Sequence, residues 1–252
     1  MKNEKKALED YIDVIMQLPL KEKYTKEELL VKPLLIDSLD NIEIYYAPHN
    51  DYINKEAKIF IVGITPGFLQ MDLAISTARR CLEQGMSIEA IKKECKLVAR
   101  FSGPLRKNLI SMLDEIGLHH IVGLACCEEL FSTCYMHTTS VIPYPTFVNG
   151  TNYTGHSPKL IKNEFLMSYA ISCIKEELQQ LKYTENILIV PLGKAVEEVL
   201  FYFASIGLFK PQQILQGFPH PSGANGNRIK QLEANKHNLI TQLKGLSAPF
   251  YI

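Results

Sequence analysis

Two short runs that are apolar at every position are each followed by a glycine. They are Ile59–Val62 and Ile187–Leu192. A short apolar run bounded by a turn residue is typical of a strand buried on both faces of a sheet. Alternation at Ile42, Ile44 and Tyr46 predicts a further strand, with one buried face.

Elsewhere apolar residues recur at helical spacing. The clearest stripe begins after Pro104, runs through Leu109 and Leu113, and ends at Gly117. We also expect two helices over 70–98 that are broken near Gly85. Four further helices are expected to bury Leu8, Tyr11, Ile12 and Ile15; Ile161, Phe165 and Tyr169; Val196, Val199, Leu200 and Phe203; and Ile229, Leu232, Leu239 and Ile240. The helix that carries Phe165 and Tyr169 is expected to be long and to begin at Ser157-Pro158. The helix that carries Val196 and Phe203 follows Gly193.

Strands therefore alternate with helices along the chain. Two more strands are expected over 134–142 and just before Phe218, and the turn-rich stretch 143–157 is expected to be a loop. This order predicts an α/β fold, a three-layer α/β/α arrangement around a central, mostly parallel twisted sheet. No linker or repeat interrupts it. We expect a single domain over 1–252, with a core at 58–243 and a helical extension plus an edge strand over 1–50.

Composition and charge narrow the classes of function. The chain has 252 residues, with 27 basic and 27 acidic side chains and a formal net charge of zero. This balance argues against an avid, sequence-blind nucleic-acid binder, whose affinity comes from neutralising phosphates. Eight basic residues between Arg79 and Lys107 form either a solvated helical face or a phosphate-facing patch. The charged start of the chain and the lack of a long apolar run favour a cytoplasmic protein that binds no membrane.

The cysteines do not have the spacing of a metal or disulfide framework. No C-x-x-C pair is present, and no histidine stands at zinc-finger distance from a cysteine. We therefore expect no metal and no cofactor. The six residues are Cys81, Cys95, Cys126, Cys127, Cys134 and Cys173.

Two loops that follow predicted strands carry candidate chemistry. Gly63-Ile64-Thr65-Pro66-Gly67 places a proline between glycines, which makes a stiff turn whose backbone N–H groups a ligand can approach. In Phe218-Pro219-His220-Pro221-Ser222-Gly223, two prolines bracket a histidine and fix the backbone on both sides of it. Both loops are expected at the carboxyl ends of strands, where ligands bind in α/β sheets.

The order of these motifs resembles the uracil-DNA glycosylase superfamily. Phe101-Ser102-Gly103-Pro104-Leu105 is similar to the segment that supplies the family's base-stacking aromatic. Ile189-Val190-Pro191-Leu192-Gly193 is similar to the strand before the family's histidine loop. The resemblance covers roughly residues 58–243 and is closest to the single-strand-selective and mismatch-specific branches.

The resemblance implies a role for each matching residue. His220 would donate a hydrogen bond to the departing base, and Thr65 stands where active branches carry the Asp or Asn that handles the attacking water. The remaining positions are a base-binding group of Ile64, Phe101 and Thr139, and a phosphate-binding group of Ser222, Gly223 and Arg228. Asp72 is the nearest alternative acid, His137 an alternative base reader, and Arg228 equally fits a solvent-facing helix residue.

The resemblance implies a monofunctional DNA glycosylase of base excision repair, which we expect to be a monomer. It would flip out uracil or another deaminated base and hydrolyse its N-glycosidic bond. Ala224 is too small for the wedge that fills the gap left by the base, so single-stranded or distorted DNA is the expected substrate. The alternative is a weak or inactive relative that binds a nucleobase or single-stranded DNA, because Thr65 and Thr139 replace the usual polar residues. A third hypothesis, a hydrolase, would pair Cys126, Cys127 or Ser222 with His119, His120 or His220.

Overall fold

The protein is described by a computed structural model of residues 6–101 and 103–246. Two parts of the predictions lie outside the described residues: Ser102 of the predicted aromatic segment, and residues 1–5 of the charged start. The chain divides into two compact units, each assembled from three separate stretches. Unit 1 contains Met1–Ile53, Thr65–Ser102 and Ser140–Ile174, and unit 2 contains Asn54–Ile64, Gly103–Thr139 and Lys175–Ile252. The single domain expected from the sequence stays a prediction.

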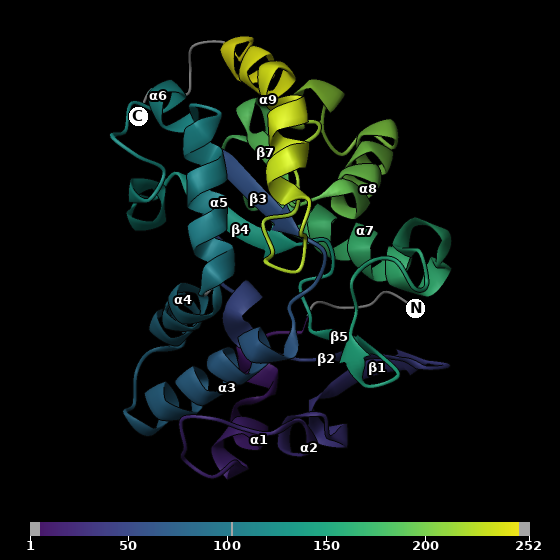
Figure 1. The fold of residues 1–252 in the computed structure, drawn as a ribbon. Coiled ribbons are helices and arrows are strands. Elements are labelled where there is room, and N and C mark those ends of the chain that lie inside the picture. Colours follow the sequence, from purple (N-terminus) through teal and green to yellow (C-terminus); the bar gives the residue numbers. More distant parts are fainter. Residues whose placement is uncertain (1–5, 102, 247–252) are drawn as a thin grey trace. The chain divides into compact units, whose positions relative to one another are not determined.

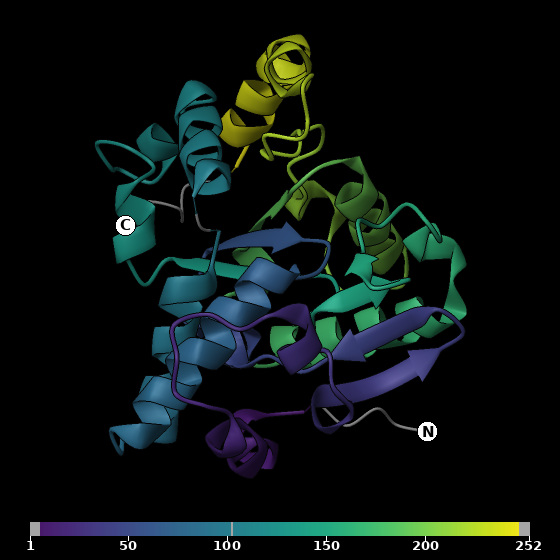
Figure 2. The same ribbon diagram turned by 60° about the horizontal axis from the view of Figure 1, so that its bottom comes forward.

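Unit 1 is built on a four-stranded antiparallel sheet with the order β1-β2-β5-β6 (Figures 1 and 2). Its strands are β1 (Leu35–Leu39), β2 (Ile42–Tyr45), β5 (Thr146–Val148) and β6 (Thr151–Asn152). The alternating strand expected around Ile42 is confirmed as β2.

The loop expected over 143–157 is wrong in part, because β5 and β6 form a hairpin there. Its two turn residues, Asn149 and Gly150, have φ angles of 50° and 69°. An Asn-Gly pair with positive φ at both positions matches the right-handed twist of the flanking strands, which explains the hairpin.

The helices of unit 1 are α1 (Ile12–Gln17), α2 (Lys26–Leu29), α3 (Phe68–Glu83) and α4 (Ile88–Ala99). The expected break near Gly85 is confirmed, and α3 and α4 lie side by side (Figures 1 and 2). The long helix expected from Ser157-Pro158 begins later: α7 is Glu164–Leu178. Its first turn is capped by Asn163, whose side-chain oxygen accepts the Leu166 N–H at 2.9 Å. Asparagine at this position stabilises a helix start as effectively as serine.

Unit 2 is built on a three-stranded sheet with the order β4-β3-β7. The strands are β4 (Met136–Ser140), of which only the last residue belongs to unit 1, β3 (Ile59–Gly63) and β7 (Leu188–Pro191). β3 and β7 are parallel, with Ile59 opposite Leu188 and Val62 opposite Pro191. All five β3 residues are buried, as the apolar run predicted.

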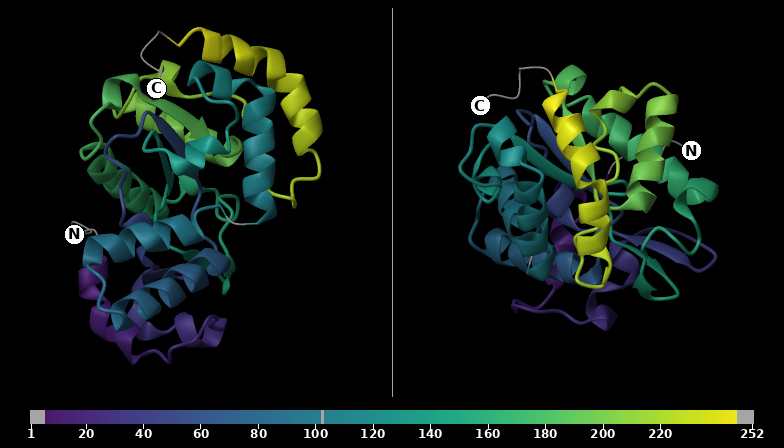
Figure 3. Two further views of the ribbon diagram at one scale, coloured as in Figure 1. Left: turned by 90° about the vertical axis from the view of Figure 1, so that its left-hand side faces the viewer. Right: turned by 45° about the horizontal axis from the view of Figure 1, so that its top comes forward.

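Helices flank this sheet, so the α/β class expected from the sequence is confirmed. They are α5 (Pro104–Glu115), α6 (Leu118–Ile121), α8 (Lys194–Ser205) and α9 (Arg228–Lys244). Figure 3 shows α5 and α9 running side by side, and α8 packs against β7. Short 3-10 turns occur at Leu8–Asp10, Lys32–Leu34, Pro48–Asn50, Glu129–Ser132, Leu160–Lys162, Thr184–Asn186 and Pro211–Gln213.

Two expectations for the C-terminal part need correction. The strand expected just before Phe218 is only an isolated parallel bridge between Ile189 and Ile214. Ile229, expected to face inward from α9, is 69% exposed, whereas Leu232 and Leu239 are buried as predicted. Ile229 lies in the first turn of α9, which begins only at Arg228. Within residues 6–101 and 103–246, no helix combines the length and apolarity that crossing a bilayer requires.

Candidate functional site

The loops after β3 and β7 leave the same edge of the unit 2 sheet. The two strands are parallel and in register up to Val62 and Pro191, so Ile64 and Gly193 both follow at their carboxyl ends. Ligands in α/β proteins bind outside this edge. Ile64 is half-buried and directly follows β3, and its predicted base-binding role stays a prediction.

His220 is held at this edge by the turn that begins α8. Gly193 has a φ of +89°, and a Cβ added to it would lie 2.9 Å from the His220 Cβ. Only glycine permits this approach. The Gly193 N–H also donates to the Phe218 carbonyl at 3.3 Å, which ties the histidine loop to the end of β7.

The tautomer of His220 follows from its own loop. The Ser222 N–H donates to Nδ1 at 3.1 Å, so that nitrogen carries a lone pair and the proton of the neutral ring is on Nε2. Burial lowers the pKa of His220. At neutral pH the side chain is therefore an uncharged hydrogen-bond donor through Nε2.

The loop after His220 is fixed by polar contacts within unit 2. Asn108 on α5 donates to the Pro221 carbonyl at 2.8 Å, and Asn225 donates to the His220 carbonyl at 3.1 Å. Ser222 Oγ accepts the Ala224 N–H at 3.2 Å and keeps its own proton for donation. Ser222, a member of the predicted phosphate-binding group, thus lies on a stiff turn.

The other two members of that group also belong to unit 2. A Cβ on Gly223 would meet no atom within 4 Å, so its backbone is approachable. Half-buried Arg228 is the first residue of α9. The sequence-based choice between a phosphate ligand and a helix surface residue stays open for Arg228.

Thr139 lies on β4 in a buried polar cluster. Its Oγ1 donates to Glu177 Oε2 at 3.0 Å, and Glu177 Oε1 contacts His137 Nε2. His137 Nδ1 in turn accepts the Asn54 N–H at 3.3 Å. Both side chains expected to read a base, Thr139 and His137, therefore already bind the same carboxylate, Glu177.

Thr65 belongs to unit 1, and its hydroxyl is also engaged. Oγ1 donates to the Tyr144 carbonyl at 2.8 Å and accepts the Thr146 N–H at 3.1 Å. Its single proton is thus used on Tyr144, just before β5, and one lone pair is used on the first residue of β5, so only the remaining lone pair is left for a water molecule. Asp72, the alternative acid, is 5% exposed and accepts the Tyr24 N–H at 2.8 Å.

Phe101 follows α4 in unit 1 with a φ of 38° and 9% of its surface exposed. A positive φ is unfavourable for a bulky side chain, and such strain is concentrated at functional positions. Its predicted stacking role stays a prediction.

Three of the eight basic residues between Arg79 and Lys107 point inward within unit 1. Arg79 and Lys92 pair with Glu83 at 2.5 Å and Glu9 at 2.7 Å. Lys96 is 4% exposed and donates to Asn50 Oδ1 at 2.7 Å. These three therefore form neither a solvated face nor a phosphate patch.

Sequence reasoning missed the buried polar turn at Pro48–Asn50. Asn50 joins Lys96 to the Pro143 carbonyl, to which it donates at 2.8 Å. Its neighbour His49 is 2% exposed, and burial together with the Lys96 charge lowers the pKa of His49 to about 3. Pro48 at the first position is the one local signal for this turn.

The structure does bring one cysteine of the hydrolase hypothesis beside a histidine. Cys127, His119 and Asp114 offer donor atoms that all lie within 4.8 Å of one another. The Cys127 side chain is fully buried, and burial raises the pKa of its thiol. A buried, protonated thiol is a poor nucleophile, so this arrangement does not favour a cysteine hydrolase.

No family model matches the chain, and its family is shown by one similar protein. The uncharacterized protein YoxB of Bacillus subtilis strain 168 is 40% identical over 244 residues, which cover 96% of this chain and 94% of YoxB. The chain therefore belongs to the family of YoxB.

A solved structure also resembles the fold over most of the chain. The wild-type Pedobacter heparinus SMUG2 crystal structure matches 94% of this chain and 97% of its own, at 14% identity and a TM-score of 0.46. At this distance, function must be argued from the residues of this chain.

Proposed function

We propose that this protein is a DNA glycosylase-like enzyme that receives a flipped-out, deaminated base at the carboxyl edge of β3 and β7. The observation that carries the proposal is the state of His220, which is a neutral hydrogen-bond donor through Nε2. The close approach of Gly193 and the hydrogen bond from the Ser222 N–H fix its position. The resemblance of the motifs to uracil-DNA glycosylases supplies the class of reaction.

The chemistry assigned to His220 is stabilisation of a leaving group. The bond between the sugar C1′ and the base nitrogen breaks with its electron pair going to the base. Negative charge then grows on the base oxygen, where the His220 Nε2–H donates. Water adds to C1′ and releases a proton to solvent, and the departed base takes up a proton. A donor that is already neutral and oriented needs no reorganisation as this charge develops.

The neighbouring groups supply binding. In this proposal the Ile64 backbone N–H is a second donor to the base, from the loop after β3. Ser222, Gly223 and Arg228 hold the phosphate next to the extruded nucleotide, since a hydroxyl, an approachable N–H and a guanidinium are typical phosphate ligands. The exposed Ala224 leaves the gap in the duplex unfilled, which favours single-stranded or distorted DNA.

Base release tests this proposal directly. The protein is incubated with single-stranded and duplex oligonucleotides that contain uracil, hypoxanthine or xanthine, and alkali converts each abasic site to a strand break. We expect breaks on at least one substrate, with a loss of roughly 100- to 1000-fold in kcat for His220→Ala, the cost of removing one charge-stabilising donor. His237→Ala is the matched control, because His237 is exposed on α9. Equal rates for the two variants would rule out the role of His220.

A second candidate function is a binding protein without efficient catalysis. The engaged hydroxyls of Thr65 and Thr139 favour it, because neither hydroxyl has a proton left to orient water or read a base. This candidate expects oligonucleotide binding that His220→Ala or Phe101→Ala weakens, with no base release from any substrate at stoichiometric protein. Fluorescence anisotropy on the same oligonucleotides separates the two candidates.

A further inference from the structure

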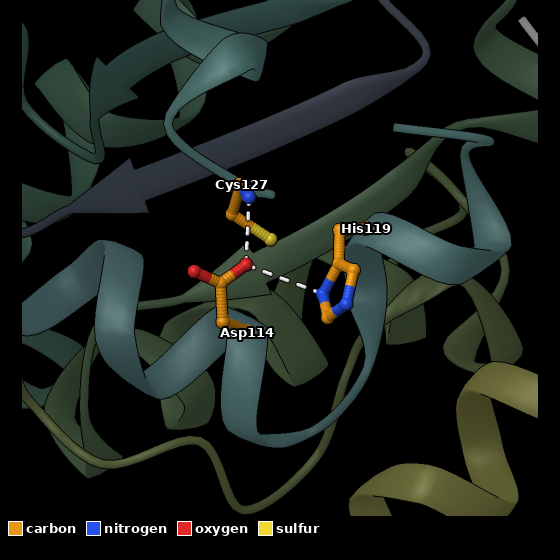
Figure 4. A group of neighbouring side chains, drawn as sticks. All are labelled: Asp114, His119 and Cys127. Carbon is orange, nitrogen blue, oxygen red and sulfur yellow. Dashed lines mark hydrogen bonds and ion pairs between the residues drawn. The ribbon is translucent and has the colours of Figure 1, made fainter. Parts of the chain in front are cut away.

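A second cluster of reactive side chains lies at the α5–α6 corner of unit 2. Asp114 is in the last turn of α5, His119 is in α6, and Cys127 follows the turn after α6. Figure 4 shows the three side chains pointing toward one another. Each offers one metal-ligating atom, and these atoms lie within 4.8 Å of one another.

The distances within the cluster suit a tetrahedral metal ion. Asp114 Oδ1 and His119 Nδ1 are 3.2 Å apart. Two such ligands at about 2.0–2.2 Å from one zinc ion are separated by roughly 3.3–3.5 Å. The Cys127 N–H donates to the same Asp114 oxygen at 2.6 Å, which orients the carboxylate toward the cluster.

The Nδ1 atom of His119 has no hydrogen-bond partner at this point. This nitrogen is buried and makes no hydrogen bond with good geometry, although the Asp114 oxygen is close. A buried nitrogen without a partner is costly. A cation between the two atoms would satisfy both, because each would bind it through a lone pair.

The donor set selects the class of metal. A thiolate and an imidazole suit borderline and soft ions such as zinc, whereas magnesium and calcium prefer sites made of oxygen ligands. On binding, the Cys127 thiol loses its proton to solvent. The thiolate and the Asp114 carboxylate then balance the two positive charges of the ion, so the partly buried site carries no net charge.

We propose that Asp114, His119 and Cys127 bind one zinc-class divalent transition metal, with the fourth position open to water. The site is separate from the His220 loop and does not depend on the proposed function. It closes a loop from residue 114 to 127, so bound metal stabilises this corner of unit 2 against unfolding.

Cobalt(II) titration of the full-length, tag-free protein tests the site, because a cobalt–thiolate bond gives a charge-transfer band in the near ultraviolet. We expect the band to saturate at one cobalt per chain and zinc to displace it. Cys127→Ser should abolish the band, and His119→Gln should weaken cobalt binding at least tenfold. Cys126→Ser is the matched control and should leave binding unchanged, since Cys126 is the adjacent thiol and lies outside the cluster.

Thermal unfolding gives a second readout. Zinc should raise the Tm of the wild type and the Cys126→Ser variant but not that of His119→Gln, which decides the matter if Cys127→Ser does not fold. A wild type that binds no stoichiometric cobalt overturns the proposal. A band that persists in Cys127→Ser, or a zinc-induced rise in Tm that persists in His119→Gln, overturns it as well.

Discussion

Acid should destabilise this protein through His49 in particular. The buried imidazole has its pKa lowered to about 3 by burial and by the nearby Lys96, against 6.5 for an ordinary histidine. Between these two values the unfolded chain binds one more proton than the folded chain. The stability that His49 contributes is therefore complete above about pH 6.5 and is lost as the pH falls toward 3.

The magnitude follows from this difference. Each pH unit below about 6.5 costs roughly 1.4 kcal/mol, so the loss at about pH 5 is near 2 kcal/mol. Other titrating groups add their own terms, which a comparison of variants removes. His49→Gln has no proton to take up at this position, so its stability should fall by about 2 kcal/mol less than that of the wild type between about pH 7 and pH 5.

Urea unfolding at the two pH values measures this difference, with hydrogen exchange of peptides from Pro48–Asn50 and α4 as a probe local to unit 1. Each variant is compared with itself at neutral pH, so any general loss of stability in His49→Gln cancels. His156→Gln is the matched control, because His156 is exposed in the same unit. Parallel pH profiles for the wild type and His49→Gln would refute the reasoning.

Three further substitutions test the remaining contacts. Gly193→Ala should lower the free energy of unfolding by about 1–3 kcal/mol and abolish any base release, because the new Cβ meets the His220 Cβ at 2.9 Å. Gly207→Ala, with a φ of +80° and open space around it, should lower stability less and leave base release unchanged in the same thermal and cleavage assays. Thr65→Val should cost about 1–3 kcal/mol in urea unfolding, since the Tyr144 carbonyl and the Thr146 N–H both lose their hydrogen bond to the Thr65 hydroxyl. Glu177→Ala should cost about 3–5 kcal/mol, since His137 Nε2 and Thr139 Oγ1 both lose the buried carboxylate.

Two outcomes would contradict these contacts. Equal stability and base release in the two glycine variants would show that the close approach to His220 is unimportant. A Thr65→Val loss no larger than that of Thr151→Val would show that the Thr65 hydroxyl does not hold its loop, because Thr151 is exposed on β6.

The sequence predicted the elements that have a strong local signal. The all-apolar runs became β3 and β7, and the stripe after Pro104 became α5. The hairpin at Asn149-Gly150 was not predicted, because its strands are three and two residues long and are too short to show alternation. The start of α7 was misplaced because Ser157-Pro158 and Asn163 are both reasonable helix starts, and only the Leu166 N–H bond distinguishes them.

The candidate site was predictable to the same extent. The His220 loop carries its own stiffness in two prolines, so it could be recognised from its residues alone. The partners of Thr65 and Thr139 could not be, because Tyr144 lies 79 residues from the first and Glu177 lies 38 residues from the second. The sequence does not show whether a hydroxyl is free to bind a ligand, because its hydrogen-bond acceptor is brought to it only by the fold.

The two units are each built from three stretches of chain that alternate along the sequence. No single cut of the gene can yield one whole unit, because each of the five crossings between the six stretches separates parts that belong together. To express one unit alone, its three stretches would have to be joined by new linkers in place of the stretches of the other unit. A gene segment that is duplicated or transferred as one continuous stretch therefore cannot encode either unit alone.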